Sequence, residues 1–488
     1  ITTVTVGSPT SFLATAHGLS DGQYVWLSEI TGGTDIDLNG YYPITRTDAN
    51  NFTIAVNTTG QAAYSNGRSL EMLNENIPSA NGEWDEWQGV SGHSAALFIY
   101  AESDPATYYS NIYYVRWFSA PLIFYRTTGT IEISGINFRY CSMPFNLGLG
   151  AGSSSTAGAL WMHDCVCNDN YYGIYATAPE TGTQFWWDGL VIEDNHVYRS
   201  RATGIAGADY MKNSIIQRNL IHDVCRSYSD GGVYFGNCYA PVGSENKIQL
   251  NEIYNINEGL YWPTDGACIL MDSKTAGIKI RSNFVYNSET GLGDNSSRNN
   301  VWSSNIVVNC DYGIKVSDSE SGLARSMNLK YFNNTLVNCG ADNYTNSELA
   351  GKNRAIRINC FAGDATAVVE LGNNIIVGAD ISSTYGISVE QQFIAAGATY
   401  TEYNNCVYNC LYELVENLID ASSSLDSTDI TVDPLLQPST YKLLSGSPCR
   451  HAGKYVSGLK DKQLSPFSIP PNMGAYGNTS RTPARIGL

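Results

Sequence analysis

One short phrase of polar and apolar residues recurs between residues 190 and 410: an Asn, any residue, and then Val, Ile or Leu. It begins at Asn195, Asn219, Asn251, Asn283, Asn305, Asn334, Asn374 and Asn405, with spacings of 24, 32, 32, 22, 29, 40 and 31 residues. A repeat of this length, with short apolar runs and turns but no sustained helical period, is typical of a β-solenoid. The pattern therefore predicts stacked coils of short strands, about 4.8 Å apart.

The frame of the repeat narrows the kind of solenoid. Leucine-rich repeats would show a Leu-x-x-Leu-x-Leu frame and helical repeats a helical period, and the sequence has neither. A parallel β-helix remains, in which stacked Asn amides would hydrogen-bond along a column at the turns. We predict an all-β chain with a single-stranded parallel β-helix over residues 76–430 and a capping segment over 431–488.

The first 75 residues follow a different pattern, with alternating strands joined by Gly, Asp and Asn turns. The stretch "ATAHGLSDGQYVWLSEITGGTDIDLNGYYPITRTDANNFTI" is similar to a small β-barrel module first named in ubiquitin-activating enzymes and also found in phage tail proteins. We therefore predict a separate small N-terminal β-barrel-like domain over residues 1–75, acting as a spacer or attachment module.

Composition excludes some partners. The formal net charge of −18 repels phosphate backbones, so no nucleic acid partner is expected. No run of 18 apolar residues exists, so no membrane insertion is expected. Cys310, Cys339 and Cys410 each follow an Asn at matching points of the repeat, and we predict buried thiols stacked in the core rather than disulfides.

Two stretches place acids at similar points of successive coils: "SDGGVYFGN" (229–237) and "TDGACILMD" (264–272). Aligning Gly232-Val-Tyr with Ala267-Cys-Ile puts Tyr234 and Ile269 on the outer surface. One line of acids then precedes the strands (Asp230, Asp265, Glu289 and Asp311), and a second polar line follows them (Asp209, Asn237, Asp272 and Asp318).

The spacing within such a line suits catalysis by two carboxylates. Neighbours on adjacent coils lie about 5 Å apart and next-but-one neighbours about 10 Å apart. Retaining and inverting glycosidases hold their two carboxylates at about 5 Å and about 6.5–9.5 Å. Two other interpretations stay open: the acids cap turns, or stacked carboxylates bind Ca²⁺. The catalytic interpretation requires no cofactor, and no C-x-x-C pair predicts a zinc site.

Residues 120–480 resemble right-handed parallel β-helix proteins that act on polysaccharides, including phage tailspikes. The ending "DPLLQPSTYKLLSGSPCRHAG…PNMGAYG" (433–477) is similar to the C-terminal phrase of many such proteins. "SDGGVYF" followed by "ACILMD" resembles β-helical glycoside hydrolases of the fucosidase/xylanase type, which implies catalysis by Asp230 and Asp272. Met271-Asp272-Ser273 departs from the second acid that the family often has there, and the alignment of coils pairs Asp230 with Asp265. All three acids are therefore candidates.

Substrate-binding candidates surround these acids. Tyr261 and Trp262 stand in a Pro-containing loop before Asp265, and aromatic rings beside acids can stack on sugar faces. Tyr234 is predicted to face outward from its strand. His222 and Arg226 precede Asp230, where His222 could move a proton. For each of these residues the alternative is a structural role in the coil.

Three functions follow from these residues. The first is a glycoside hydrolase that cleaves a polysaccharide or oligosaccharide with two carboxylates. The second is a polysaccharide lyase acting on a uronate-containing glycan with Lys315, Arg226 or His222 as its base. The third is a glycan-binding tailspike or adhesin without catalysis. The resemblance implies an extracellular location (secreted, cell-surface or virion-associated) and, as for many tailspikes, a homotrimer.

Overall fold

The structure is a computed structural model. It describes residues 1–15, 19–21, 24–28, 30–36, 38, 40–65, 68–72, 84–87, 96–99, 122–124, 131–141, 144–147, 159–176, 187–226, 231–239, 244–256, 266–273, 275–317, 328–340, 353–359, 367–390, 398–416 and 424–477. Within these ranges the regular elements are all strands, and no helix is long and apolar enough to cross a bilayer. The chain forms two compact units, Ile1–Tyr113 and Tyr114–Leu488.

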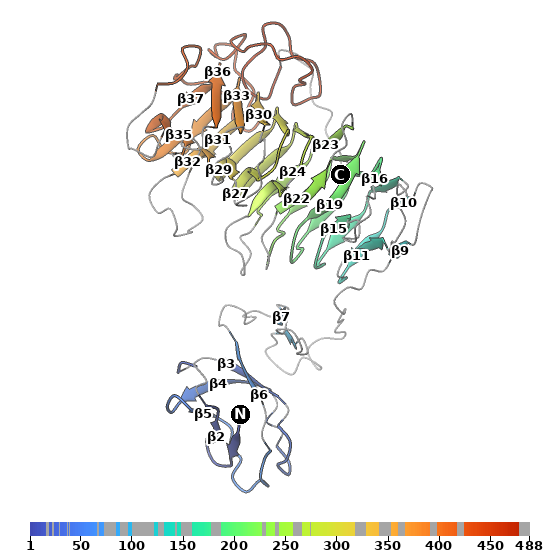
Figure 1. Ribbon diagram of the computed structural model, residues 1–488, viewed down its shortest axis with the longest axis vertical. Helices are drawn as coiled ribbons and strands as arrows, with labels where there is room; N and C mark the ends of the chain where they lie inside the picture. The colour runs from blue at the N-terminus through green and yellow to red at the C-terminus, as the bar shows by residue number, and fades with distance from the viewer. Residues whose placement is uncertain are drawn as a thin grey trace. The chain divides into compact units, whose positions relative to one another are not determined.

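The first unit contains a six-stranded antiparallel sheet with the strand order β1-β2-β5-β4-β3-β6 (Figure 1). Its strands are β1 (Thr3–Thr5), β2 (Thr10–Leu13), β3 (Tyr24–Ser28), β4 (Gly40–Arg46), β5 (Asn51–Ile54) and β6 (Arg68–Met72). Alternate residues are buried, and the Phe12 and Phe52 rings stack 5.2 Å apart in a core of its own. A separate antiparallel pair joins β7 (Trp84–Trp87) and β8 (Ala96–Ile99).

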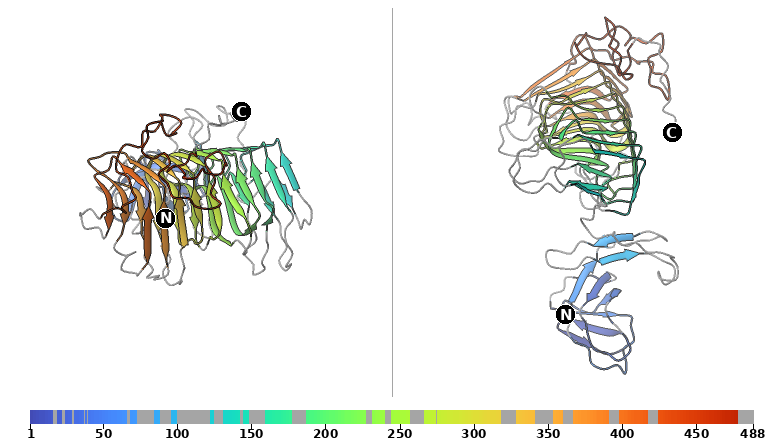
Figure 2. Two further views of the ribbon diagram at one scale, coloured as in Figure 1. Left: turned by 90° about the horizontal axis from the view of Figure 1, so that it is seen from above. Right: turned by 90° about the vertical axis from the view of Figure 1, so that its right-hand side faces the viewer.

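The second unit is a parallel β-helix, which confirms the predicted fold class. The first coil contributes strands to two faces, each later coil contributes a strand to each of three faces, and the strands lie side by side in chain order (Figures 1 and 2). Face A consists of β10 (Ile131–Ser134), β13 (Leu160–His163), β17 (Val191–Glu193), β20 (Ile215–Gln217), β23 (Asn246–Gln249), β26 (Ile278–Arg281), β28 (Val301–Ser303), β30 (Asn328–Phe332), β33 (Val368–Gly372) and β36 (Thr399–Tyr403).

Faces B and C follow face A in each coil, and two long strands, β27 (Phe284–Asn295) and β29 (Ile306–Ser317), pass from one to the other. Face B also holds β11 (Asn137–Arg139), β14 (Val166–Asn168), β18 (His196–Tyr198), β21 (Leu220–His222), β24 (Glu252–Tyr254), β31 (Thr335–Cys339), β34 (Ile375–Gly378) and β37 (Cys406–Tyr408).

Face C also holds β15 (Ile174–Ala176), β19 (Ile205–Lys212), β22 (Gly231–Tyr239), β25 (Ala267–Asp272), β32 (Asn353–Ile358), β35 (Thr384–Val389) and β38 (Tyr412–Glu416). Three further strands complete the unit: β9 (Leu122–Phe124), β12 (Phe145–Leu147) and β16 (Trp187–Asp188).

The repeated Asn forms the corner between faces A and B. Every turn there has two residues, of which the second is the repeat Asn from Asn195 onward. Each of these Asn side chains is buried, and from Asn195 to Asn374 its Nδ2 donates to the Oδ1 of the next Asn at 3.0 Å. This confirms the predicted amide column and explains why the turn needs Asn: one side chain satisfies buried polar groups of two coils.

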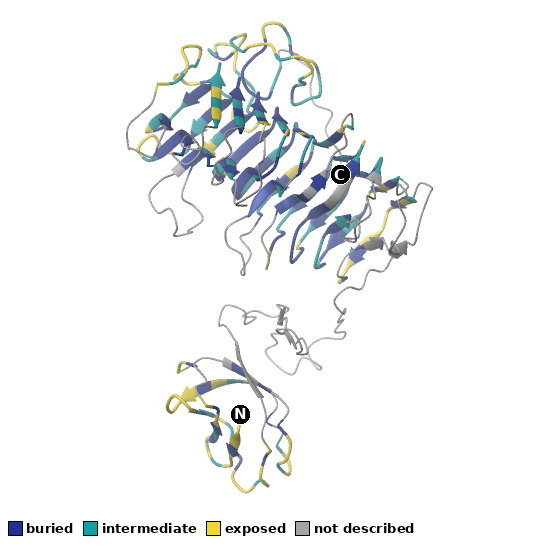
Figure 3. Ribbon diagram, viewed as in Figure 1, coloured by how far each residue is buried: buried dark blue, intermediate teal, exposed yellow. Residues whose placement is uncertain are grey.

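The core of the β-helix is apolar and continuous from Ile133 to Leu414. Cys310, Cys339 and Cys410 lie in it as buried thiols outside disulfides, as predicted. In the β-helix, Figure 3 shows most of the strands buried or partly buried and most exposed residues in the turns and the C-terminal segment.

The C-terminal segment runs back along the corner between faces A and B. Asn404 Nδ2 donates to the Ala452 carbonyl at 3.0 Å, and Ser282 Oγ donates to the Asp461 carbonyl at 3.1 Å. The segment therefore reaches back from the coil of Asn404 to the coil of Ser282, and it lies away from face C.

Candidate active site

Face C differs from the other faces because connections of varied length meet both of its edges. The turn from face A to face B always has two residues. The connection from face B to face C is absent within β27 and β29, but it spans residues 255–266 between β24 and β25 and residues 340–352 between β31 and β32. The return to face A also varies, with residues 318–327 and 390–398 as examples. Variable connections on a rigid scaffold are where binding sites are usually built, which directs attention to face C.

Asp272 lies on the outer side of face C, at the end of β25. It is half-buried, and its neighbour Met271 points into the core. Its carboxylate accepts hydrogen bonds from Tyr234 Oη at 3.1 Å, from the Ser273 backbone N–H at 2.8 Å and from Asn295 Nδ2 at 2.8 Å. These donors come from three adjacent coils. They suit an ionised carboxylate, which only accepts hydrogen bonds.

Glycine makes room for the contact between Tyr234 and Asp272. Gly236 pairs in register with Asp272, and a Cβ at position 236 would meet the Tyr234 hydroxyl at 2.5 Å. The Tyr234 ring can therefore lean over position 236 toward the next coil only because that residue has no side chain. Gly236 and Asn295 were not predicted as site residues, although both stand at the position of Asp272 in neighbouring coils.

The register corrects the alignment made from sequence. Tyr234 pairs with Leu270 and Val233 with Ile269, so Ile269 is buried and does not face outward. Position 272 pairs with Gly236 and Asn295, rather than with Asn237. The alignment was wrong by one residue because the run Ala267–Met271 is apolar on both faces and its pattern does not fix the register.

The same shift changes the first line of acids. Ala267 pairs with Thr290, and Thr290 pairs with Tyr312. Gly266 therefore precedes the strand at the point where Glu289 and Asp311 stand in the next coils. Asp230, Asp265, Tyr261 and Trp262 lie outside the described residues, and so do Asn237's side chain and Asp318.

His222 and Arg226 do not share a face with Asp272. His222 lies on face B, where its ring stacks on Tyr198 at 5.4 Å and on Tyr254 at 4.8 Å. Its Nδ1 lies 2.6 Å from Asp223 Oδ2 and its Nε2 lies 2.8 Å from His196 Nε2. Arg226 is exposed just beyond the corner between faces B and C. The structure therefore brings Tyr234 to Asp272 but gives His222 an aromatic stack on another face.

Asp294 looks equivalent to Asp272 in sequence but points into the core. It pairs in register with Met271 and is fully buried. Tyr331 Oη donates to it at 2.6 Å and Asn300 Nδ2 at 3.2 Å, and Ser297 and Trp302 donate as well. Burial raises the pKa of Asp294 to about 7, in spite of these donors. This acid is a structural group of the core.

Basic residues gather farther along face C. Lys315 Nζ lies 3.6 Å from Glu289 Oε1 and packs against the Tyr312 ring. Lys315 pairs in register with Arg357, which donates to Glu390 at 2.6 Å. Lys315 was considered from sequence, whereas Arg357 and Glu390 were missed. Within the described residues, no group of three or more His, Cys, Asp or Glu side chains could hold a metal ion. Ca²⁺ binding thus stays a prediction.

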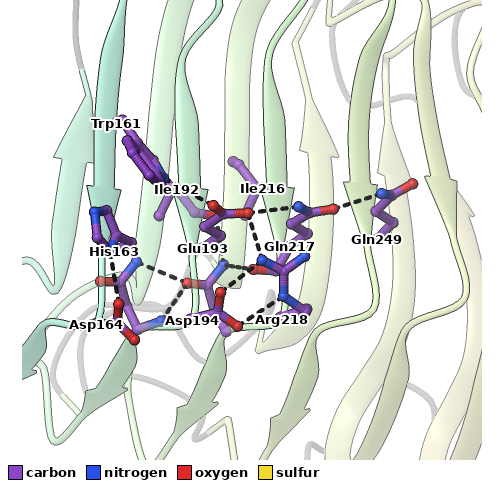
Figure 4. Close-up of polar contacts among 12 residues, drawn as sticks. Trp161, His163, Asp164, Ile192, Glu193, Asp194, Ile216, Gln217, Arg218 and Gln249 are labelled. Carbon is purple, nitrogen blue, oxygen red and sulfur yellow. Dashed lines mark hydrogen bonds and ion pairs between the residues drawn. The ribbon is translucent and has the colours of Figure 1, made fainter. Parts of the chain in front are cut away.

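A second polar group lies on face A (Figure 4). Trp161 Nε1 donates to Glu193 Oε1 at 2.9 Å, Gln217 donates to Glu193 at 2.7 Å, and Gln249 donates to Gln217 at 2.7 Å. Arg218 pairs with Glu193 at 2.7 Å. These side chains bond to one another along the helix axis, and the face A to face B turns beside them keep a constant length. We interpret this group as a ladder that stabilises the stack.

Comparisons with known proteins add little to this geometry. No protein family model matches the chain, and no curated protein matches it. Among solved structures, the chain is similar to the catalytic unit of a thermostable GH87 α-1,3-glucanase from Streptomyces thermodiastaticus strain HF3-3, with 9% sequence identity, 87% of each chain covered and a TM-score of 0.34. At that TM-score the likeness carries no argument, so the fold rests on the strand register.

Proposed function

We propose that the protein is a glycoside hydrolase that cleaves a polysaccharide on face C. The observation that carries the proposal is the Asp272 carboxylate, held on the outer side of this face by donors from three coils. An ionised carboxylate in a fixed position suits a base or a nucleophile. The connections of varied length at both edges of face C support this location.

The second carboxyl group would come from Asp230 or Asp265, the acids that sequence predicts beside Asp272. In this mechanism the second group protonates the glycosidic oxygen as the bond to the leaving sugar breaks. In the inverting route Asp272 takes a proton from the water that attacks the anomeric carbon. In the retaining route Asp272 attacks the anomeric carbon itself, and water, deprotonated by the second carboxyl group, then releases the sugar from Asp272. The separation of the two carboxyl groups decides between these two outcomes. Tyr234 and Asn295 would hold Asp272 in place, and no cofactor is required.

A polysaccharide lyase is the second candidate, because Lys315 and Arg357 are register neighbours on the same face. A lyase would use a basic residue to remove a proton beside a uronate carboxylate, and its product would carry a new double bond. A tailspike or adhesin without catalysis is the third candidate, and the predicted N-terminal module would fit it.

A panel of neutral and acidic polysaccharides separates the three candidates. Two signals are followed in parallel: release of reducing ends, and ultraviolet absorbance from an unsaturated uronate. The proposal predicts reducing ends without new absorbance. Absorbance would replace the hydrolase by a lyase, and binding without either signal would replace it by a glycan-binding rod.

A further inference from the structure

Two histidines, His196 of β18 and His222 of β21, meet on the outer side of face B, and we call them the histidine pair. Their neighbours Val197 and Ile221 point into the core, so the two imidazoles point outward. His222 pairs in register with Tyr198, which makes the two histidines diagonal neighbours on adjacent coils. Their Nε2 atoms lie 2.8 Å apart. Each ring therefore directs the same nitrogen at the other ring.

The His222 ring is fixed both in its plane and in its tautomer. It stacks on Tyr198 of the preceding coil at 5.4 Å and on Tyr254 of the next coil at 4.8 Å. Its Nδ1 lies 2.6 Å from Asp223 Oδ2. Because an ionised carboxylate only accepts hydrogen bonds, Nδ1 carries a proton, and the neutral ring keeps its Nε2 lone pair toward His196. A carboxylate on the far nitrogen is the usual partner of a metal-bound histidine.

Both residues of the histidine pair are partly exposed to solvent. The His222 side chain is 16% exposed, and His196 is half-buried. His196 Nδ1 has no hydrogen-bond partner among the described residues, so the His196 ring can turn slightly without breaking any hydrogen bond other than the one to His222. A small shift within the side chains is therefore enough to admit an ion between the two Nε2 atoms.

The donor atoms select the kind of ion. Two imidazole nitrogens suit Cu²⁺, Ni²⁺ and Zn²⁺, whereas Ca²⁺ and Mg²⁺ prefer oxygen ligands. Two imidazole nitrogens that each lie at about 2.0–2.1 Å from one such ion are about 3 Å apart, close to the spacing of the histidine pair. We infer that the histidine pair binds one transition-metal dication through both Nε2 atoms, in place of the proton that they share. Water completes the coordination of the ion.

His163 on face A provides a matched contrast. Its Nδ1 lies 2.7 Å from Asp164 Oδ2 and its Nε2 lies 3.1 Å from Glu132 Oε1, so both nitrogens face carboxylates and neither offers a lone pair. Within the described residues no group of three or more acids, histidines or cysteines could hold a metal ion. The histidine pair therefore supplies two protein ligands only, and the bound ion should exchange with solution. This inference does not depend on the proposed hydrolase.

Calorimetric titration of the tag-free chain with Ni²⁺ near neutral pH tests the inference. We expect a site for one ion per chain whose Kd rises at least about tenfold in His196→Gln and in His222→Gln. Asp223→Asn should weaken binding by about tenfold, because it removes the carboxylate that orients the His222 ring. His163→Gln should leave the Kd unchanged. Unfolding midpoints of the variants, measured without metal, show whether each variant is folded.

The electron paramagnetic resonance spectrum of Cu²⁺-loaded wild type gives a test that needs no variant. Coupling of the copper signal to two imidazole nitrogens is expected, since the histidine pair supplies both. The inference would be overturned by a spectrum without imidazole nitrogens, by Ni²⁺ binding that both histidine substitutions leave unchanged, or by no binding at millimolar Ni²⁺. In each of these cases the two rings form only an N–H···N hydrogen bond that stabilises face B.

Discussion

Asp272 and Asp294 occupy matching places in the sequence, each 11 residues before the Asn of the next corner, yet they have opposite environments. Asp272 ends its strand on the outer side of face C, and Asp294 stands one register position earlier, opposite Met271, in the core. Because side chains alternate along a strand, a shift of one residue moves an acid from the surface to the interior. A repeated acid in the sequence therefore indicates a functional site only when it is also known whether its side chain points outward or into the core.

The difference extends to charge. Asp272 is half-buried and accepts from Tyr234 and Asn295 on neighbouring coils, which suits an ionised group available to a substrate. Asp294 is closed off by Ser297, Asn300, Trp302 and Tyr331, and burial raises its pKa to about 7. The environment of Asp272 suits a role in catalysis, whereas the environment of Asp294 suits a structural role in the core.

The largest expected effect on stability comes from Asp294. Asp294→Ala would leave the buried donors of Ser297, Trp302 and Tyr331 without this acceptor, whereas Asn300 would keep Ser297 Oγ, and each orphaned donor costs about 1–3 kcal/mol. We expect the free energy of unfolding to fall by several kcal/mol, about 4 or more, in urea titrations. Asp272→Ala, which removes a half-buried acid, should change it by about 1 kcal/mol or less. Similar losses in the two variants would contradict the assigned environments.

The pH dependence of stability should also separate the two acids. Since the folded-state pKa of Asp294 is raised from the ordinary value near 4 to about 7, the folded protein keeps a proton that the unfolded chain releases. The contribution of Asp294 to stability is thus greatest below about pH 4 and falls as the pH rises toward 7, by up to about 1.4 kcal/mol per unit.

Asp294→Asn should remove that slope, because an amide does not titrate. The measurement is the difference in unfolding free energy between wild type and Asp294→Asn across this range, which cancels the contributions of other groups. A difference that does not vary with pH would show that Asp294 is ionised in the core throughout.

A smaller effect is expected at Tyr234. Tyr234→Phe removes one of the donors that hold the Asp272 carboxylate in place, and a misplaced catalytic group loses activity. We expect kcat/KM to fall by about tenfold or somewhat more, with little change in the unfolding midpoint. Gly236→Ala should reproduce part of this loss by displacing the Tyr234 hydroxyl. If both variants keep full activity, Tyr234 does not position the acting carboxylate.

Much of the fold could be predicted from the sequence because the corner between faces A and B demands one residue type. A two-residue turn with a buried amide repeats at every coil from Asn195 onward, so Asn219 and Asn334 mark the same structural point in spite of unequal spacing. Cys310, Cys339 and Cys410 were predictable for the same reason, since each follows an Asn that stands four residues after the repeat Asn.

The candidate site was less predictable. In Ala267–Met271 both faces of the strand are apolar, so the pattern gives no register, and Ile269 was placed on the wrong side. Asn295 and Gly236 are not acidic, so the search for repeated acids in the sequence did not identify them. Arg354 and Glu390 are 36 residues apart and meet only because adjacent coils stack. Contacts between residues of different coils cannot be predicted from the sequence until the strand register is known.

The central claim is that the outward acid, and not its buried counterpart, carries the chemistry. Its most direct test is the release of reducing ends by wild type, Asp272→Asn and Asp294→Asn, on the best substrate of the panel and per mole of folded protein. The account predicts that Asp272→Asn loses at least about 10²-fold in kcat while Asp294→Asn stays close to wild type. Full activity of Asp272→Asn would contradict it.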